Sequence, residues 1–201
     1  MNGVVVFEDR STVITIRTKR SVLRPFAADD ANRLFPLFAE WPVIQWLSAP
    51  PWPYRLAHMQ NFVDRLLAED SPDREVFRVI EIGGMPIGGI SLRQRERSHL
   101  QSGSGPNVGY WLGTQYWGQG YMTEAVTALA QHTFATSNAE AIYSGVLAEN
   151  ARSLRVQTKV GFERDGATML HSNPRNTELP HVNTKLTRRT FEASNTRKPA
   201  P

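Results

Sequence analysis

The sequence feature that most limits the fold is a strand that passes into a helix through a turn containing Gly118 and Gly120. Residues 108–112 have the composition of a short buried strand, and from Met122 to residue 136 apolar residues recur at helical spacing. Glycines in such a turn permit positive φ and let a ligand approach the main chain without meeting a Cβ atom. The helix N-terminus offers unpaired N–H groups and a partial positive charge to an anion. The pattern predicts a phosphate or pyrophosphate site, with a tight turn that needs glycine only for its geometry as the alternative.

Two better-known phosphate loops do not fit this turn. The P-loop motif requires a Gly-Lys pair followed by Ser or Thr, and the chain contains no Gly-Lys pair. The dinucleotide fingerprint requires a third glycine, but Thr123 stands at that position. Both of these nucleotide-binding classes are therefore excluded.

The rest of the chain indicates one mixed α/β (α+β) domain. Its 201 residues, 40 % apolar and 21 % charged, match an ordinary globular domain rather than a disordered or fibrous one. We expect the domain to span residues 12–189, between an N-terminal extension (1–11) and a disordered basic tail (190–201). Asp29 is the expected N-cap of the first helix, which Pro36 shortens or kinks. The predicted strands are 12–24 (with a break near Lys19-Arg20 as the alternative), 76–82, 85–94, 108–112, 141–147, 161–165 and 182–189. The predicted helices are 29–38, 58–69, 118–136 and 150–160, and residues 41–53 are expected to form a stiff aromatic loop.

Charge and residue usage exclude several classes of protein. The formal net charge is +4, but the last 14 residues carry four basic side chains and one acidic one, so the remainder is near +1. A nucleic-acid-binding surface would add a basic stripe through the fold, and none is visible. No apolar run approaches the roughly 18–20 residues that span a bilayer. The chain has no cysteine, and its five histidines lack metal-ligand spacing. We therefore expect no nucleic acid, membrane or metal partner, and, without a secretory pattern at the N-terminus, a cytoplasmic protein.

The segment Trp117-Gly-Gln-Gly-Tyr-Met-Thr-Glu-Ala125 resembles the acetyl-CoA-binding segment of the GNAT N-acetyltransferases. It is most similar to the RimJ/RimL-like branch, in which the string W-G-x-G-Y-x-T-E-A is typical. The resemblance covers residues 17–189. Four more strings follow the order of that branch: Leu23-Arg24-Pro25 with Asp29-Asp30-Ala31, Val43-Ile44-Gln45-Trp46-Leu47, Pro86-Ile87-Gly88-Gly89-Ile90, and Asn150-Ala-Arg-Ser153 with Gly161-Phe162.

The resemblance implies a single GNAT-like domain whose mixed, mostly antiparallel central sheet splays between its fourth and fifth strands and is flanked by about four helices. Pantetheine would lie between strands 108–113 and 141–148, and pyrophosphate on the turn 117–122. Met122 stands where the broader family pattern has Gly or Ala. The implied cofactor is acetyl-CoA, with coenzyme A as product. The implied cofactor-binding residues are Trp111, Leu112, Gly113, Trp117, Gly118, Gln119, Gly120, Tyr121, Met122, Thr123, Asn150 and Ser153.

Asn150 and Ser153 are the candidates nearest to the chemistry. Asn is a favoured N-cap, so helix capping alone explains its position before residues 151–160. The resemblance implies in addition that Asn150 bonds pantetheine and that Ser153 lies near the sulfur. Many family members carry a tyrosine further along this helix as general acid, and the matching residue here is Gln157. Ser153 is therefore the catalytic candidate, protonating or hydrogen-bonding the departing thiolate.

A base must deprotonate an ammonium acceptor, because a lysine-like amine titrates near 10 and an α-amine near 8. Glu81, Glu149 and His99 are candidates, although each is more often a surface or structural residue. Since ordered water relays this proton in some family members, the base stays unassigned.

Trp46 and Trp52 border the groove where the acceptor is expected. They are either buried anchors or a stacking wall for a peptide end or an aromatic amine. The preferred function is direct acetyl transfer from acetyl-CoA to a primary amine in a ternary complex, with a protein N-terminus or a small molecule as the acceptor and the possibility of a homodimer left open. The alternative is a non-catalytic acyl-CoA-binding sensor, which Gln157 favours.

Overall fold

One eight-stranded sheet organises the protein, in the order β1-β2-β3-β4-β5-β6-β8-β7. The structure is a computed structural model that describes residues 15–68, 76–95 and 105–196. Neighbouring strands are antiparallel except β5 and β6, which are parallel. The strands are β1 (Ile16–Arg17), β2 (Val22–Arg24), β3 (Val76–Ile82), β4 (Met85–Arg95), β5 (Gly105–Leu112), β6 (Ala141–Leu147), β7 (Glu163–Ser172) and β8 (Thr177–Thr187).

Within the described ranges, six α-helices and one 3-10 helix accompany the sheet: α1 (Asp30–Phe38), α2 (Trp41–Ile44), α3 (Leu56–Leu67), η1 (Thr114–Tyr116), α4 (Tyr121–Thr136), α5 (Ala151–Val160) and α6 (Arg188–Thr196). The four predicted helices correspond to α1, α3, α4 and α5. The mostly antiparallel α/β class is confirmed. The first predicted strand is broken at Lys19-Arg20, the alternative considered from the sequence, because Thr18 and Ser21 close a turn between β1 and β2.

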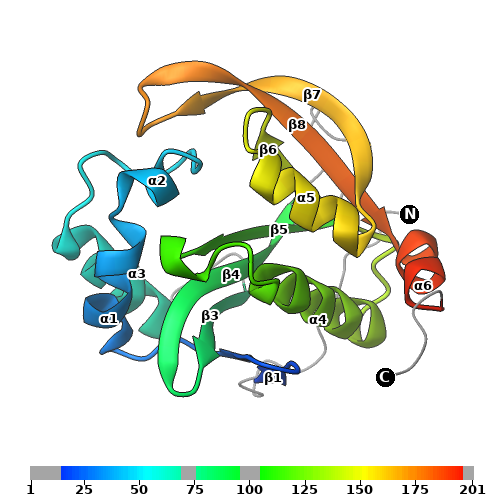
Figure 1. Ribbon diagram of the computed structural model, residues 1–201, viewed down its shortest axis with the longest axis horizontal. Helices are drawn as coiled ribbons and strands as arrows, with labels where there is room; N and C mark the ends of the chain where they lie inside the picture. The colour runs from blue at the N-terminus through cyan, green and yellow to red at the C-terminus, as the bar shows by residue number, and fades with distance from the viewer. Residues whose placement is uncertain (1–14, 69–75, 96–104, 197–201) are drawn as a thin grey trace.

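The two faces of the sheet bury two hydrophobic clusters, because side chains alternate along a strand. On β3, Val79 packs into a cluster with α1 and α3 that includes Leu34 and Val63. Its neighbour Ile80 packs into the larger cluster, which includes Val126 and Leu129 of α4. Figure 1 shows α1 and α3 on one side of β3 and β4 and α4 on the other. The sheet is therefore the middle layer of this part of the molecule.

The predicted splay between two central strands is confirmed, and it separates β5 from β6. Only Asn107 and Tyr143 are paired in register between these strands. The Ser144 hydroxyl then donates to the carbonyl of Val108 at 2.9 Å. Beyond this bond both strands line one cavity. In Figure 1 this open side of the sheet lies between α2, α5 and the arch of β7 and β8.

One local prediction about a helix is wrong, and a second is confirmed in position but not in its capping bond. Residues 41–53 were expected to be irregular, but α2 begins there, since Pro42 suits the first turn of a helix and Val43 and Ile44 are buried. Asp29 holds the N-cap position of α1 without a side-chain capping bond. The Asp30 carboxylate instead accepts the N–H of Ala27 at 2.8 Å.

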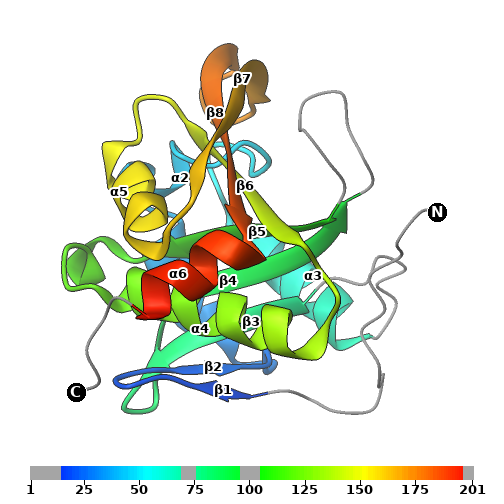
Figure 2. The ribbon, with the colours of Figure 1, turned by 90° about the vertical axis from the view of Figure 1, so that its right-hand side faces the viewer.

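The prediction for the C-terminal segment needs the larger correction. Residues 190–201 were expected to be a disordered basic tail, yet α6 continues to Thr196. Phe191 is 5 % exposed and its ring lies 5.4 Å from that of Phe134. Arg188 donates to the carbonyls of Ser137 and Ala139 beyond the end of α4, at 2.9 and 3.0 Å. One aromatic side chain and one structural arginine outweigh the polar composition, and Figure 2 shows α6 lying across α4. The predicted N-terminal extension, residues 1–11, and residues 197–201 lie outside the described residues.

Candidate functional site

The splayed strands open on a cavity of about 470 Å³. Main-chain and side-chain atoms of β5, β6, α5 and the η1–α4 turn line it on one side, and residues 43–48 with β7 and β8 line the other. Of the twelve predicted cofactor-binding residues, ten line this cavity, and Gly113 and Gln119 do not. Residues from separate parts of the chain are therefore brought together at one site.

The glycine turn has the backbone that the sequence predicts. Gly118 and Gly120 have φ of +77° and +86°, a left-handed conformation that other residues adopt at a cost. Gly120 is the N-cap of α4, so the N–H groups of Tyr121, Met122 and Thr123 have no partner within the helix. These donors and the positive end of the helix dipole lie at the cavity, which suits an anion.

Met122 belongs to the hydrophobic core as well as to the cavity wall. Met122 is 6 % exposed and packs in the hydrophobic cluster that contains Val126. The larger side chain in place of Gly or Ala is therefore accommodated in the core of the protein.

Arg20 holds the glycine turn in place without lining the cavity. This role of Arg20 was not predicted from the sequence. Its guanidinium donates to the carbonyl of Gln119 at 3.0 Å and to the Glu124 carboxylate at 2.9 Å, and it lies 4.4 Å from the centre of the Tyr121 ring. Burial raises the pKa of Glu124, but hydrogen bonds from Thr18 and Arg20 outweigh this effect and hold the pKa below its ordinary value. The negative charge in the first turn of α4 is thus paired on the side facing β1 and β2.

Trp117 fixes the path from β5 to the turn. Its indole N–H donates to the Leu112 carbonyl at 2.8 Å. The Gly113 N–H donates to Ile87 of the strand-pairing neighbour β4 at 3.0 Å. Because backbone groups of successive strand residues point in opposite directions, the Leu112 N–H faces the open side toward β6. Of the predicted main-chain contacts at residues 111–113, this donor is the one that the local geometry directs at the cavity.

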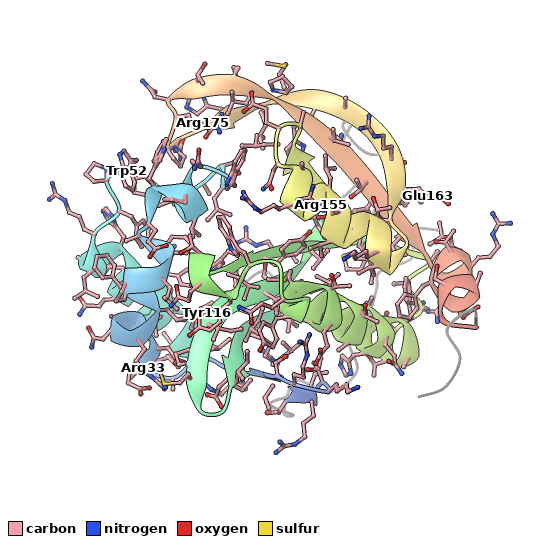
Figure 3. All side chains as sticks on the ribbon, in the orientation of Figure 1. Arg33, Trp52, Tyr116, Arg155, Glu163 and Arg175 are labelled. Atoms are coloured by element: carbon pink, nitrogen blue, oxygen red, sulfur yellow. The ribbon has the colours of Figure 1, made fainter. Side chains whose placement is uncertain are left out.

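Three cations line the cavity from one face of α5, and sequence reasoning missed them. Arg152, Arg155 and Lys159 are spaced three and four residues apart, the spacing that places side chains on one side of a helix. Arg152 lies 4.8 Å from the centre of the Trp117 ring, which brings α5 close to the glycine turn. Figure 3 shows Arg155 on α5, near the middle of the molecule. This spacing after Asn150 is the signal that could have identified them.

Asn150 and Ser153 lie at the start of α5, on the cavity wall. The Asn150 side-chain oxygen accepts the Ser153 N–H at 3.1 Å, so the capping bond considered from the sequence is present. The Ser153 hydroxyl lies 2.8 Å from the hydroxyl of Tyr110, a β5 residue that sequence reasoning did not select. Gln157 is buried one turn further along.

The predicted acceptor residues separate in the structure. Trp46 lines the cavity, with the Arg175 guanidinium 5.1 Å from its ring centre. Trp52 is 44 % exposed and is not among the lining residues; its ring packs against that of Trp41 at 4.9 Å between centres, with the two planes tilted by 58°. Figure 3 shows Trp52 at the outer margin and Arg175 at the turn between β7 and β8.

The two candidate bases among the described residues, Glu81 and Glu149, lie away from the cavity wall. Glu81 pairs with Arg24 at 2.5 Å, and Glu149 pairs with Arg175 at 3.1 Å. Neither lines the cavity, and His99 lies outside the described residues. His181 of β8 does line it, beside Gly145, where a Cβ atom would lie 2.0 Å from the imidazole. Of the lining residues that the structure describes, none is Asp or Glu.

The described residues contain no cluster of three or more His, Asp or Glu side chains arranged to hold a metal ion. No helix among them is both long and apolar enough to cross a membrane.

Comparisons with known proteins agree on one family. A family profile described as "Acetyltransferase (GNAT) domain" matches residues 20–163. An uncharacterized N-acetyltransferase, p20 of Bacillus licheniformis, is 26 % identical over 156 residues, which cover 76 % of this chain and 84 % of p20. Among solved structures, Mycobacterium smegmatis RimJ in complex with CoA-disulfide matches with a TM-score of 0.75 and 21 % identity, over 92 % of this chain and 94 % of RimJ. The ribosomal L7/L12 acetyltransferase RimL in complex with coenzyme A matches with a TM-score of 0.72 and 17 % identity, over 87 % and 98 % of the two chains.

Proposed function

The chain belongs to the GNAT acetyltransferase family, and from that premise we propose that it moves the acetyl group of acetyl-CoA to a primary amine by direct transfer in a ternary complex. The observation that carries this proposal is the left-handed glycine turn, which opens α4 onto the cavity between β5 and β6. The turn alone would serve many anions. Its position beside two splayed strands makes an extended ligand with a diphosphate at one end the better fit.

The residues around the cavity fit acetyl-CoA, which would supply the activated acetyl thioester. The N–H groups of Tyr121, Met122 and Thr123 would hold the pyrophosphate. Arg152, Arg155 and Lys159 would offset the remaining phosphate charge from α5. The facing edges of β5 and β6 would bond the pantetheine arm as if it were a strand.

The carbonyl oxygen of the thioester gains negative charge as the amine attacks, so a fixed donor there lowers the barrier. We assign this role to the Leu112 N–H, since the Leu112 carbonyl and the Gly113 N–H are already bonded within the protein. Asn150 would bond pantetheine through its amide N–H₂ while its oxygen caps α5. Ser153 would hydrogen-bond the departing sulfur.

The lining residues favour an acceptor that carries a single amine. A polycation such as a polyamine would need carboxylates, and no described lining residue supplies one. Trp46 and Leu47 instead offer apolar surface beside the cavity. An α-amine titrates near 8, so a larger fraction is neutral at pH 7 than for a lysine-like amine near 10. A protein N-terminus is therefore our preferred acceptor.

We assign the removal of the acceptor proton to His181, because an imidazole works as a base near neutral pH and this one lines the cavity. Assembly as a homodimer and a cytoplasmic location stay predictions.

A thiol-release assay with acetyl-CoA tests the proposal. The panel would pair peptides with free N-termini against the same peptides with acetylated N-termini, and would add polyamines and lysine side-chain models. We expect thiol release that depends on a free α-amine, with the acetylated peptide identified by mass spectrometry. A polyamine preferred over every peptide would contradict the acceptor assignment.

A non-catalytic acyl-CoA sensor remains the second candidate, favoured by Gln157, which stands at the position matching the family's tyrosine. The same panel separates the two functions. Two results together would support the sensor. Calorimetry would show tight binding of acetyl-CoA, and no thiol would be released from acetyl-CoA with any amine, nor any labelled product formed in cell extract supplied with labelled acetyl-CoA.

A further inference from the structure

The buried side chain of Gln157 is hydrogen-bonded within the protein through both its amide nitrogen and its amide oxygen. It is 1 % exposed. Its amide nitrogen donates to the Ser144 hydroxyl at 2.9 Å, and its amide oxygen accepts the Thr184 hydroxyl at 2.8 Å. An amide does not give up a proton near neutral pH, and this one ties α5 to β6 and β8. Gln157 therefore does not supply a proton to the leaving sulfur.

Tyr110 of β5 places its hydroxyl at the start of α5, beside Ser153. It lies on β5, between Val108 and Leu112, and its side chain shares their face of the sheet because alternate residues do. Its hydroxyl lies 2.8 Å from the Ser153 hydroxyl, close to the start of α5. Both residues line the cavity. Two hydroxyls from two separate elements thus form one hydrogen-bonded pair beside the proposed pantetheine path.

We propose that Tyr110 is the proton donor to the leaving sulfur, with Ser153 as its hydrogen-bonded relay, an inference that rests on the proposed acetyl transfer. Tyr110 gives its proton to the sulfur as the carbon–sulfur bond breaks and its electron pair stays on sulfur. The new carbon–nitrogen bond forms at the acetyl carbon, and the nitrogen loses a proton to the base. Tyr110 regains a proton through Ser153 from solvent, so protons and charge balance over the turnover.

The titration of Tyr110 agrees with a role as donor. Burial raises its pKa to about 12, although hydrogen bonds to Ser153 and Gln157 act in the opposite direction. The hydroxyl is therefore protonated at neutral pH. A thiolate forming in the same desolvated cavity is also destabilised, which favours transfer of this proton.

The first test compares Tyr110→Phe with a matched control, Tyr54→Phe. Tyr54 is not among the cavity-lining residues, and its ring packs 4.7 Å from that of Phe38, so its variant removes a phenol hydroxyl without touching the Ser153 pair. We expect kcat to fall about 100-fold in Tyr110→Phe with KM for acetyl-CoA within threefold, as removal of a general acid predicts. We expect Tyr54→Phe to stay within twofold of the wild type. Equal kcat in the two variants would overturn the proposal.

The second test needs no turnover. The thiol pKa of bound coenzyme A is followed by the ultraviolet absorbance of its thiolate, because a donor beside the sulfur stabilises that thiolate. We expect the bound thiol pKa to be about one unit higher in Tyr110→Phe than in the wild type, a tenfold change in the ionisation constant. No change would contradict the assignment. This readout holds even if the wild type acetylates no amine, the outcome that would instead refute the proposed function.

A third variant covers the case in which Tyr110→Phe folds poorly. Incorporating 3,5-difluorotyrosine at position 110 keeps the hydroxyl and lowers the phenol pKa. We expect the alkaline limb of the kcat–pH profile to move to lower pH. A profile identical to that of the wild type would count against proton donation by Tyr110.

Discussion

Gly120 meets two conditions at one position, a φ of +86° and little space where a side chain would begin. A Cβ atom there would lie 3.3 Å from the Arg20 guanidinium that supports the turn. Single residues of this kind decide whether the N-terminus of α4 can be approached by a ligand. Arg20 and Glu124 are 104 residues apart in the chain, so no local pattern in the sequence reveals that they meet at this turn.

Gly120→Val is expected to weaken acetyl-CoA binding at least tenfold, because a strained backbone costs about 1–3 kcal/mol and moves the N–H donors. Calorimetric titration measures the change. Gly84→Val is the matched control: Gly84 has φ of +80° in the β3–β4 turn, and no atom lies within 4 Å of the added Cβ. Equal losses of affinity in both variants would show that the turn at Gly120 has no special part in binding.

Helix α5 shows how one element can serve both folding and binding. Its N-cap Asn150 bonds the helix backbone, and its cations line the cavity. Local patterns predicted this helix, the α4 helix and the β3–β4 hairpin, since each depends on residues close in sequence. The pairing of Tyr110 with Ser153 was not predicted, because strand and helix meet only through the tertiary fold.

Asn150→Asp separates the two roles of the cap. Aspartate keeps the acceptor oxygen and suits a helix N-terminus, so the free energy of unfolding is expected to stay within about 0.5 kcal/mol of the wild type. The variant loses the amide N–H₂, and the Kd for acetyl-CoA is expected to rise about tenfold, as the loss of one good hydrogen bond implies. Chemical denaturation and calorimetry measure the two quantities. Unchanged affinity would leave capping as the whole role of Asn150.

Helix α1 is joined to the sheet by a buried ion pair. The Asp30 side chain is fully buried and accepts from Arg24 at 2.6 and 2.8 Å. Burial raises the pKa of Asp30, but hydrogen bonds from Arg24 and Ala27 outweigh burial and lower it below 3.8. Because the folded-state pKa is the lower one, the ionised carboxylate stabilises the fold above pH 3.8, and this contribution is lost as the pH falls through the folded-state pKa.

Asp30→Asn is expected to lower the free energy of unfolding by about 3 kcal/mol at pH 7, since it leaves the partly buried Arg24 incompletely paired. The difference from the wild type should shrink as the pH falls below 3.8 and through the lowered pKa of the native carboxylate. Urea unfolding at several pH values measures it. Asp29→Asn is the control, because Asp29 is exposed and its pair with Arg33 is worth less than about 1 kcal/mol. A pH-independent difference would contradict the assigned ion pair.

Across the whole molecule, the C-terminus completes the larger hydrophobic cluster through α6. Composition indicated a solvated tail, because one phenylalanine among polar residues gives a weak periodic signal. In the aromatic segment, Trp46 lines the cavity, whereas Trp52 packs at a tilted angle against Trp41 outside it. Sequence patterns predicted the order of most strands and helices and the glycine turn, whereas long-range packing decided which aromatic side chains line the cavity.

Phe191→Ala is expected to cost about 3 kcal/mol, because it opens a cavity against Phe134. For a domain of this size, the loss corresponds to a Tm about 6–12 °C lower, measured by calorimetry. Phe191→Leu keeps most of the buried volume and should lose less than half as much. If the alanine variant melts with the wild type, α6 does not contribute to the stability of the core.

The single register pair of Asn107 and Tyr143 also governs how the two portions of the sheet cohere. A bound acyl donor would bridge both portions, and at a hundredfold excess over its Kd it would stabilise the folded state by about 2.7 kcal/mol. Resistance to proteolysis would then follow the supply of the donor. Depletion of acetyl-CoA would leave more of the protein in the free form, so limited proteolysis with and without acetyl-CoA is expected to show faster cleavage of the free form.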